Sequence, residues 1–310
     1  MPPTGAPERT SAGSLWGTLA VISCAWGSSF LFVKLISGSL GPFTFAACRG
    51  FIAMMALVLW LAMRHGGQGQ SEPAGPGGAP RLVELRHMAV LGTTNGWFAN
   101  VMTVFAVKYA PSSTVALVQA AVPLMVAALA HFLFPRERLS SLQWLGVIAG
   151  LLGVALIVGG VMSVQQPGAL YGVAAMLVTA FSFAVGTVYG RHAAAERPAL
   201  VACGQQAFGA IVAAVIALVV ERVELATLPL NVWLLLGVLG VFCSALPTAL
   251  YLQLLARTST VPAALVAYLQ PVWATLLGWI VLGERIGLRA LIGIALVFAG
   301  VFITGRAVRR

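Results

Sequence analysis

The segment LGERIG (Leu282–Gly287) joins two long apolar stretches through an adjacent glutamate and arginine, and the segment PRERLS (Pro135–Ser140) does the same earlier in the chain. The two glutamates, Glu137 and Glu284, lie 147 positions apart. Three further pairs recur at nearly the same spacing, 148 positions for the first and 147 for the others: Pro123 with Pro271, Gly146 with Gly293, and Gly153 with Gly300. One gapped residue reconciles the two offsets. The sequence therefore indicates an internal duplication.

The composition predicts an integral membrane protein. Of the 310 residues, 60% are apolar and 8% are charged, against about 25% charged in a typical soluble domain. The chain has no aspartate, and none of its eight glutamates lies inside a long apolar stretch. A net charge of +10 is compatible with binding to nucleic acid or anionic lipid, but we favour the positive-inside bias of a membrane protein.

The four cysteines all lie within apolar stretches and show no metal-ligand spacing. We expect reduced core cysteines, with no metal and no cofactor.

Ten segments are long and apolar enough to cross the hydrocarbon layer, which takes about 20 residues of helix. They are Leu15–Ile36, Pro42–Met63, Met88–Val107, Ser112–Phe134, Ser141–Met162, Ala169–Gly190, Ala199–Val220, Val232–Leu254, Thr260–Leu282 and Gly287–Gly305. The expected fold is an all-α integral membrane protein with ten transmembrane helices. A polar tail over residues 1–14, a Gly/Pro-rich linker over residues 66–80 that we expect to be disordered, and a basic tail over residues 306–310 complete the chain.

The charges fix the expected orientation. With both termini in the cytoplasm, twelve of the eighteen Lys and Arg residues face the cytoplasm, four face outward and two lie inside spans. The duplicated units, residues 15–162 and 168–305, hold five spans each. Because five is odd, the second unit enters the membrane from the opposite side. Such inverted repeats favour alternating access around a site near the middle of the bilayer. At each Glu-Arg junction we expect a tight turn whose charges cap helix ends or pair with each other.

Several segments resemble the EamA-like, ten-helix branch of the drug/metabolite transporter superfamily. They are AWGSSFLFVKL (Ala25–Leu35), PFTFAACRGFIAMMAL (Pro42–Leu57), FAVKYAPSSTVALVQAAVPL (Phe105–Leu124) and the two Glu-Arg junctions. The resemblance covers nearly the whole chain and implies a ten-helix bundle in a bacterial inner (plasma) membrane. It also implies export of amino acids, related metabolites or drugs. The second unit departs from the pattern, since FSFAVGTVYG lacks the Trp-Gly-Ser motif of the first.

Polar and aromatic residues near the centres of the spans are the candidates for a substrate chamber, because such groups are costly to expose to lipid. The alternative is that they form hydrogen bonds between helices. The expected substrate-binding residues are Trp26, Ser29, Arg49, Asn95, Trp97, Asn100, Gln119, Ser182, Ser244, Tyr268 and Gln270. Arg49 either binds a substrate carboxylate or extends to the outer surface.

Pro123 and Pro271 interrupt the backbone hydrogen bonding of their helices, which predicts either fixed kinks or hinges. His131 is read as a packing residue or, alternatively, a proton carrier. Gly146, Gly150, Gly186 and Gly190 predict close helix packing within the chain first, and a homodimer surface second. We expect a monomer or homodimer with a small-molecule substrate, a lipid bilayer around it and no nucleic acid.

A secondary transporter is the function the sequence favours. A channel or facilitator pore is the alternative. An intramembrane enzyme is disfavoured because the four histidines are scattered and no catalytic motif is present. The absence of acids within the spans predicts a facilitator or exchanger rather than a proton-driven pump, unless His131 carries the proton.

Overall fold

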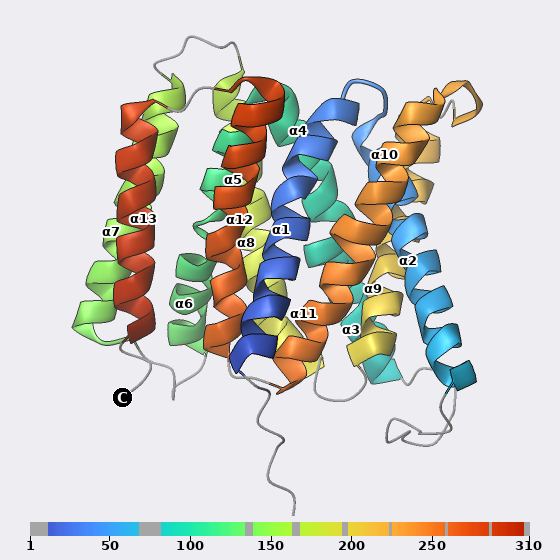
Figure 1. Ribbon diagram of the computed structural model, residues 1–310, viewed down its shortest axis with the longest axis horizontal. Helices are drawn as coiled ribbons and strands as arrows, with labels where there is room; N and C mark the ends of the chain where they lie inside the picture. The colour runs from blue at the N-terminus through green and yellow to red at the C-terminus, as the bar shows by residue number, and fades with distance from the viewer. Residues whose placement is uncertain are drawn as a thin grey trace, which may run out of the picture.

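The chain forms an all-helical bundle. The computed structural model describes residues 12–67, 82–133, 139–162, 168–193, 198–222, 225–257, 260–284 and 287–306, and these contain no strand (Figure 1). The elements in chain order are α1 (Ala12–Ile36), α2 (Pro42–Gly67), α3 (Leu82–Leu91), η1 (Gly92–Trp97), α4 (Phe98–Tyr109), α5 (Ser112–Gln119), α6 (Val122–Leu133), α7 (Ser141–Met162), α8 (Ala169–Ala193), α9 (Pro198–Val220), η3 (Leu225–Thr227), α10 (Leu230–Gly240), η4 (Val241–Ala245), α11 (Leu246–Arg257), α12 (Thr260–Leu282) and α13 (Leu288–Arg306). α1 begins and α13 ends at the lower end of the bundle in Figure 1, whereas α1 meets α2 at the upper end.

Prolines set several helix starts. α2 and α9 each begin with a proline, Pro42 and Pro198, and α5 and α10 follow Pro111 and Pro229 directly. Proline is favoured here because its φ angle suits a helix and because the first backbone N–H groups have no partner within the helix.

The segments predicted to span the membrane are helical over most of their described residues, and three differences are the largest. The third helix starts at Leu82 instead of Met88, which brings Glu84 into its first turn at 3% exposure. The fourth is broken at Ala120–Ala121. The first starts at Ala12, so the predicted tail of residues 1–14 is three residues too long. The rest of that tail, the linker from residue 68 onward and residues 307–310 lie outside the described residues.

Within the described residues, six helical stretches are long and apolar enough to cross a membrane: Gly17–Ile36, Pro42–Met63, Ser112–Leu133, Ala169–Gly190, Pro198–Val220 and Leu230–Leu254. Shorter apolar helices lie at Ser141–Ile157, Gln270–Leu282 and Leu291–Gly300. Large apolar side chains cover the outer surface of the bundle, among them Leu218 and Val219 of α9 at 74% and 82% exposure. Exposure on this scale suits hydrocarbon and not water.

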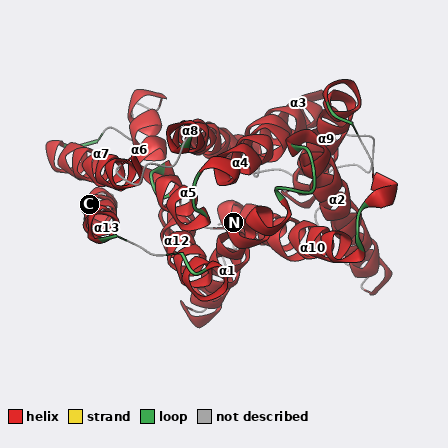
Figure 2. Ribbon diagram, turned by 90° about the horizontal axis from the view of Figure 1, so that it is seen from above, coloured by secondary structure: helices red, strands yellow, loops and turns green. Residues whose placement is uncertain are grey.

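Helices distant in sequence pack side by side. α2 lies along α9, α1 along α12, and α7 along α13, which form a pair at one edge of the bundle (Figures 1 and 2). The main core lies between α1, α2, α4, α8 and α10, and it includes fully buried side chains of Val33, Phe45, Val104, Met176 and Leu236.

Glycines permit the closest approaches. A Cβ atom added to Gly153 of α7 would lie 2.5 Å from the carbonyl oxygen of Gly293 on α13, and one added to Gly300 would lie 2.3 Å from that of Gly146. No side chain fits at such distances, so the α7–α13 contact requires glycine. The predicted intramolecular packing at Gly146 is confirmed.

Candidate functional site

Two wide π turns interrupt helices that are otherwise α-helical. η1 (Gly92–Trp97) lies between α3 and α4, and η4 (Val241–Ala245) lies between α10 and α11. In η1 the backbone of Gly96 is non-helical, with φ −100° and ψ −115°, and in η4 the N–H of Leu246 donates to the carbonyl of Val241. π turns are uncommon and are frequent at functional sites. They widen the helix and disturb its regular carbonyl pairing.

Helix α8 supplies a partner for the first π turn. The hydroxyl of Ser182 donates a hydrogen bond of 2.8 Å to the carbonyl oxygen of Thr94. One turn further along α8, a Cβ on Gly186 would lie 2.1 Å from Oδ1 of Asn95, so only glycine leaves room for this amide. Asn95 Oδ1 is buried and has no hydrogen-bond partner. It is therefore an acceptor available to a donor that enters the bundle.

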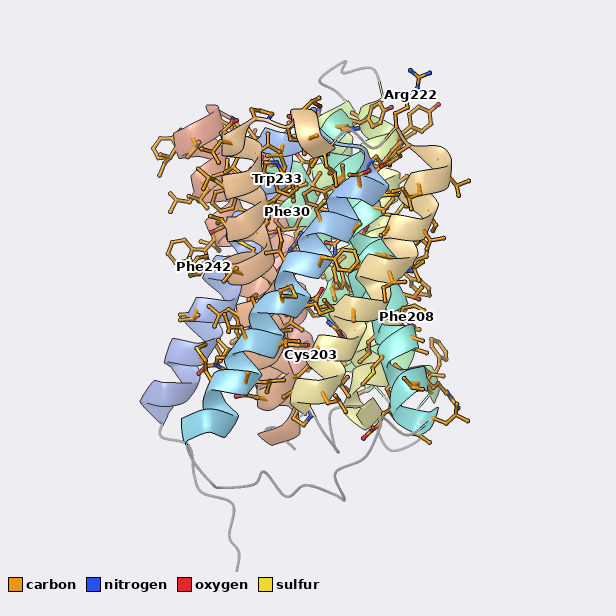
Figure 3. The ribbon with its side chains drawn as sticks, turned by 90° about the vertical axis from the view of Figure 1, so that its right-hand side faces the viewer. Phe30, Cys203, Phe208, Arg222, Trp233 and Phe242 are labelled. Carbon is orange, nitrogen blue, oxygen red and sulfur yellow. The ribbon has the colours of Figure 1, made fainter. Side chains whose placement is uncertain are left out.

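Helix α2 supplies the partner for the second π turn. Arg49, which is 7% exposed, donates from Nε to the hydroxyl of Ser244 at 2.6 Å and from Nη2 to the carbonyl of Cys243 at 3.0 Å. Ser244 in turn donates to the carbonyl of Leu239 at 2.9 Å. Phe242, the residue before Cys243, points to the outside of the bundle and is 58% exposed (Figure 3). The turn thus separates a lipid-facing aromatic ring from a buried guanidinium whose two partners here are neutral.

Close backbone contacts connect the two π turns through α9 and α2. A Cβ on Gly209 of α9 would lie 3.1 Å from the carbonyl of Gly92 and 3.2 Å from the nitrogen of Trp97. The next residue of α9, Ala210, lies against α2: a Cβ added to Gly50 of α2 would lie 3.0 Å from the Cβ of Ala210. Gly50 follows Arg49 in sequence. We call η1, η4 and the parts of α2, α8 and α9 that contact them the π-turn layer.

A second polar contact lies between α5 and α12. The amide nitrogen of Gln119 donates to Oε1 of Gln270 at 3.4 Å. α5 ends at Gln119, and Pro123 lies in the first turn of α6, because its missing N–H prevents a continuous helix. Pro271 instead lies inside an unbroken α12. The two prolines that match in sequence therefore have different local structures.

The other predicted residues are more dispersed. Trp26 packs edge-on against Tyr251, with ring centroids 5.1 Å apart, and Trp97 stacks on Phe43, with ring centroids 6.3 Å apart. Ser29 is buried and Asn100 is half-buried. The side chain of Tyr268 lies outside the described part of the structure.

The upper end of the bundle holds two glutamates that cap helices of the other half of the chain. Glu284 accepts bonds from the backbone N–H and the hydroxyl of Ser112, at 2.8 and 2.9 Å, and from the N–H of Ser113 at 2.9 Å. Burial raises the pKa of the Glu284 carboxyl, but the bonds from Ser113 and Ser112 outweigh it and hold the pKa below its usual value. Glu221 caps α2 in the same way, through the N–H groups of Phe43 and Thr44 at 2.8 Å. Capping at the second Glu-Arg junction is confirmed, whereas Glu137 lies outside the described residues.

Two further charged or titratable side chains have structural partners. Lys34 Nζ donates to the carbonyls of Val107 and Ala110, where α4 ends. His131 Nδ1 accepts the backbone N–H of Leu139 at 2.7 Å, and its ring packs against Trp144. An accepting Nδ1 carries no proton, so this geometry favours the packing interpretation of His131.

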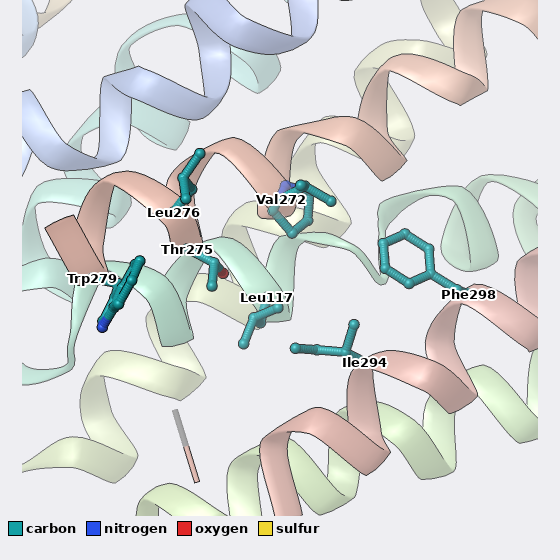
Figure 4. Close-up of a pocket in the computed structure, with 8 residues that line it drawn as sticks. Leu117, Val272, Thr275, Leu276, Trp279, Ile294 and Phe298 are labelled. Carbon is teal, nitrogen blue, oxygen red and sulfur yellow. The ribbon is translucent and has the colours of Figure 1, made fainter. Parts of the chain in front are cut away.

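The described cavity is apolar and separate from the π-turn layer. It measures about 340 Å³ and is lined by Leu117, Pro271, Val272, Thr275, Leu276, Trp279, Ile294 and Phe298 (Figure 4). Pro271 is the single predicted site residue on its wall. No cluster of His, Cys or Glu suited to a metal ion occurs in the described residues. The groups gathered in the π-turn layer are amides, hydroxyls and one guanidinium, which can bind a polar molecule reversibly.

Sequence reasoning missed several groups that the structure brings to the layer. The backbone carbonyl of Thr94 accepts a side-chain hydrogen bond where its helix widens, which the sequence did not predict. The carbonyl of Cys243 was predicted to be free, because Pro247 four residues later has no N–H to donate, but its partner Arg49 was not predicted. Thr248 pairs with Gln206 at 3.4 Å. Two sequence signals point to irregular helices: the run GTTNG (Gly92–Gly96) at η1, and Pro247 just after η4.

Comparison with known proteins finds a matching family and several similar proteins, some of them named as membrane transporters. The EamA-like transporter family matches residues 11–159 and again residues 170–306. The "Uncharacterized inner membrane transporter YedA" of Escherichia coli K12 is 29% identical over 294 residues, covering 94% of this chain and 90% of the relative. Protein PecM of Dickeya dadantii is 29% identical over 290 residues, covering 90% and 88%. A solved crystal structure superposes with a TM-score of 0.68 at 21% identity, covering 97% of this chain and all of the other.

Proposed function

Since the chain belongs to the EamA-like transporter family, we propose that it is a secondary transporter that exports small metabolites by alternating access. It is a multi-pass protein of the plasma membrane, in line with relatives named inner membrane transporters. The single observation that carries the proposal is the family match to both halves of the chain. The cargo class is amino acids, related compounds or drugs.

An inverted repeat of two five-span units, with both termini cytoplasmic, is the architecture behind this mechanism. The glycine contacts between α7 and α13 support it, because the contact of Gly153 with Gly293 becomes that of Gly300 with Gly146 when each residue is replaced by its sequence match. A contact that maps onto itself is what a twofold axis between equivalent helices produces.

The π turns give independent support for the repeat. Subtracting the 148-residue offset from residues 241–245 of η4 gives residues 93–97, which lie inside η1. Both units thus carry the same rare defect at the same position. Defects in matching helices of two repeats are the usual location of binding sites in secondary transporters.

The π-turn layer is our proposed substrate site, with Arg49 as the group that binds a substrate carboxylate. A buried guanidinium without a carboxylate partner is energetically unfavourable by several kcal/mol in order of magnitude. The described glutamates lie elsewhere: Glu221 and Glu284 cap helices at the upper end, and Glu84 lies in the first turn of α3. A carboxylate on the substrate would supply the missing charge, and Asn95 Oδ1 would accept a hydrogen bond from a donor elsewhere on the substrate, such as the ammonium group of an amino acid.

Exchange without proton coupling follows from the same distribution of acids. The described residues place no glutamate in the middle of the bundle, since Glu221 and Glu284 are at helix ends, and His131, near the end of α6, has an accepting Nδ1. Measuring proton uptake into proteoliposomes with and without a substrate gradient tests this; substrate-dependent proton flux would contradict it.

Counterflow tests the transport function itself. Proteoliposomes loaded with an unlabelled amino acid should accumulate the labelled form transiently, because a carrier exchanges one molecule for another and a simple pore does not. Flux without counterflow would favour the channel alternative, and an absence of flux for amino acids and cationic drugs alike would contradict transport of these cargo classes.

Site-directed labelling tests the inverted topology. In a variant lacking the native cysteines, Gly287→Cys should react with an impermeant maleimide from the outer face, and Arg138→Cys from the cytoplasmic face. A Cβ on Gly287 meets no atom within 4 Å, so the substitution itself should be tolerated. Labelling of both positions from one face would end the inverted-repeat proposal.

Arg49 is tested by selectivity. Arg49→Lys and Arg49→Gln should weaken transport of a carboxylate substrate far more than that of its amide analogue. Ser244→Ala, which removes the Nε partner but keeps the charge, serves as the matched control and should affect both analogues equally. Unchanged selectivity in Arg49→Gln would remove Arg49 from the site.

A further inference from the structure

The cavity beside Pro271 has an almost entirely apolar wall. Seven of its eight lining residues are apolar, and the hydroxyl oxygen of the eighth, Thr275, is buried and has no hydrogen-bond partner. A polar molecule entering here would lose its hydrogen bonds to water and find at most the buried Thr275 hydroxyl to replace them. The cavity is therefore unsuited to a zwitterionic or charged substrate.

The cavity opens toward the lipid. Its lining comes from α5, α12 and α13, and α13 belongs to the α7–α13 pair at the edge of the bundle (Figures 2 and 4). Three lining residues of α12, Val272, Leu276 and Trp279, are 50%, 40% and 61% exposed. In a plasma membrane protein, the medium in contact with such a surface is the acyl region of the bilayer.

The volume is sufficient for part of a lipid chain. Apolar cavities of about 150 Å³ bind benzene or xenon, and this one measures about 340 Å³. A void of this size without an occupant would also forfeit dispersion contacts along its whole lining. We infer that the cavity between α5, α12 and α13 binds one acyl chain of a membrane phospholipid, which packs against Pro271.

The position gives the bound chain a mechanical role. Pro271 lines the cavity, while its neighbour Gln270 is 5% exposed and holds Gln119 of α5. A Cβ on Gly27 of α1 would lie 2.7 Å from the carbonyl of Gln270. The acyl chain therefore supports α12 beside its contacts with α1 and α5, at the residue where the helix lacks a backbone hydrogen bond. Its loss should loosen α12 at this point.

Filling the cavity tests the inference. Ile294→Trp places an indole in the cavity from α13, and Ile292→Trp adds the same bulk on α13 at a residue that is 48% exposed and does not line the cavity. Native mass spectrometry of protein extracted from phosphatidylethanolamine and phosphatidylglycerol vesicles should find one phospholipid fewer on Ile294→Trp than on wild type or Ile292→Trp. Addition of those phospholipids should raise the melting temperature of wild type and Ile292→Trp, and raise that of Ile294→Trp less.

Several outcomes would overturn it. Equal lipid retention by Ile294→Trp and Ile292→Trp would show that no acyl chain occupies the cavity. Equal lipid retention with a loss of dimers in Ile294→Trp would assign the cavity to a second copy of the chain. Reduced binding of an apolar cargo with unchanged lipid would assign it to substrate. The lipid measurements do not depend on transport, so a negative result would overturn the lipid site without bearing on the transporter function.

Discussion

Removing the carboxylate of Glu284 should destabilise the folded protein, because that side chain holds the start of α5. Ser112 and Ser113 are only 1% and 4% exposed, so water cannot readily replace the carboxylate after Glu284→Ala. A buried backbone N–H left unpaired costs about 1–3 kcal/mol, and the lost interaction with the helix dipole adds about 0.3–1 kcal/mol. We expect a loss of about 2–3 kcal/mol for Glu284→Ala. Glu284→Gln, which keeps one acceptor, should lose roughly half of that.

The pH dependence identifies the cause. The pKa of Glu284 is lowered in the folded state, whereas an unfolded glutamate titrates near pH ~4.3. The stabilisation is therefore fully present above that unfolded value and is lost as the pH falls through the lower folded value. The difference in melting temperature between wild type and Glu284→Gln should be constant above pH 5 and should shrink below it.

Thermal unfolding in detergent, followed by tryptophan fluorescence, is the assay. Arg289→Gln changes a charge near the same junction, at the exposed start of α13, and should shift stability by less than about 0.5 kcal/mol. Melting of Glu284→Ala at the wild-type temperature, or a difference that stays the same from pH 7 to pH 4, would refute the capping argument.

Three further substitutions test other contacts. Glu221→Gln should lower stability by about 1–2 kcal/mol in the same melting assay, because the N-terminus of α2 loses a charged cap; an unchanged melt would contradict this. Gly300→Ala should destabilise by about 1–3 kcal/mol through forced separation of α7 and α13, whereas Gly237→Ala, which meets no atom within 4 Å, should be neutral or stabilising; equal melts for the two would count against the close-packing argument. Gly186→Ala should displace Asn95 and slow substrate exchange in proteoliposomes by more than Gly237→Ala does; equal rates would exclude Asn95 from the site.

The sequence alone determined the fold class and the division of the chain into helices. Apolar stretches of about 20 residues leave few choices, because a backbone in hydrocarbon must satisfy its hydrogen bonds within a helix. Each predicted segment is helical over most of its described residues, apart from Ala120–Ala121 and Gly287, and the family resemblance read from the short motifs was correct. Pro123 predicted a kink or hinge in its helix, but the full break at Ala120–Ala121 was not predicted, since Pro271 lacks the same N–H and lies inside an unbroken α12.

Only the tertiary structure decided which polar groups meet. Arg49 and Ser244 are 195 positions apart, and Glu284 and Ser112 are 172 apart; no local pattern relates them, because their proximity depends on how the helices pack. The π turns escaped prediction for a related reason. A wide turn is unfavourable on its own and persists where a neighbouring helix supplies a donor for its carbonyl, as Ser182 and Arg49 do here. Sequence sets which segments enter the membrane, and side-chain contacts between distant segments set where the site forms.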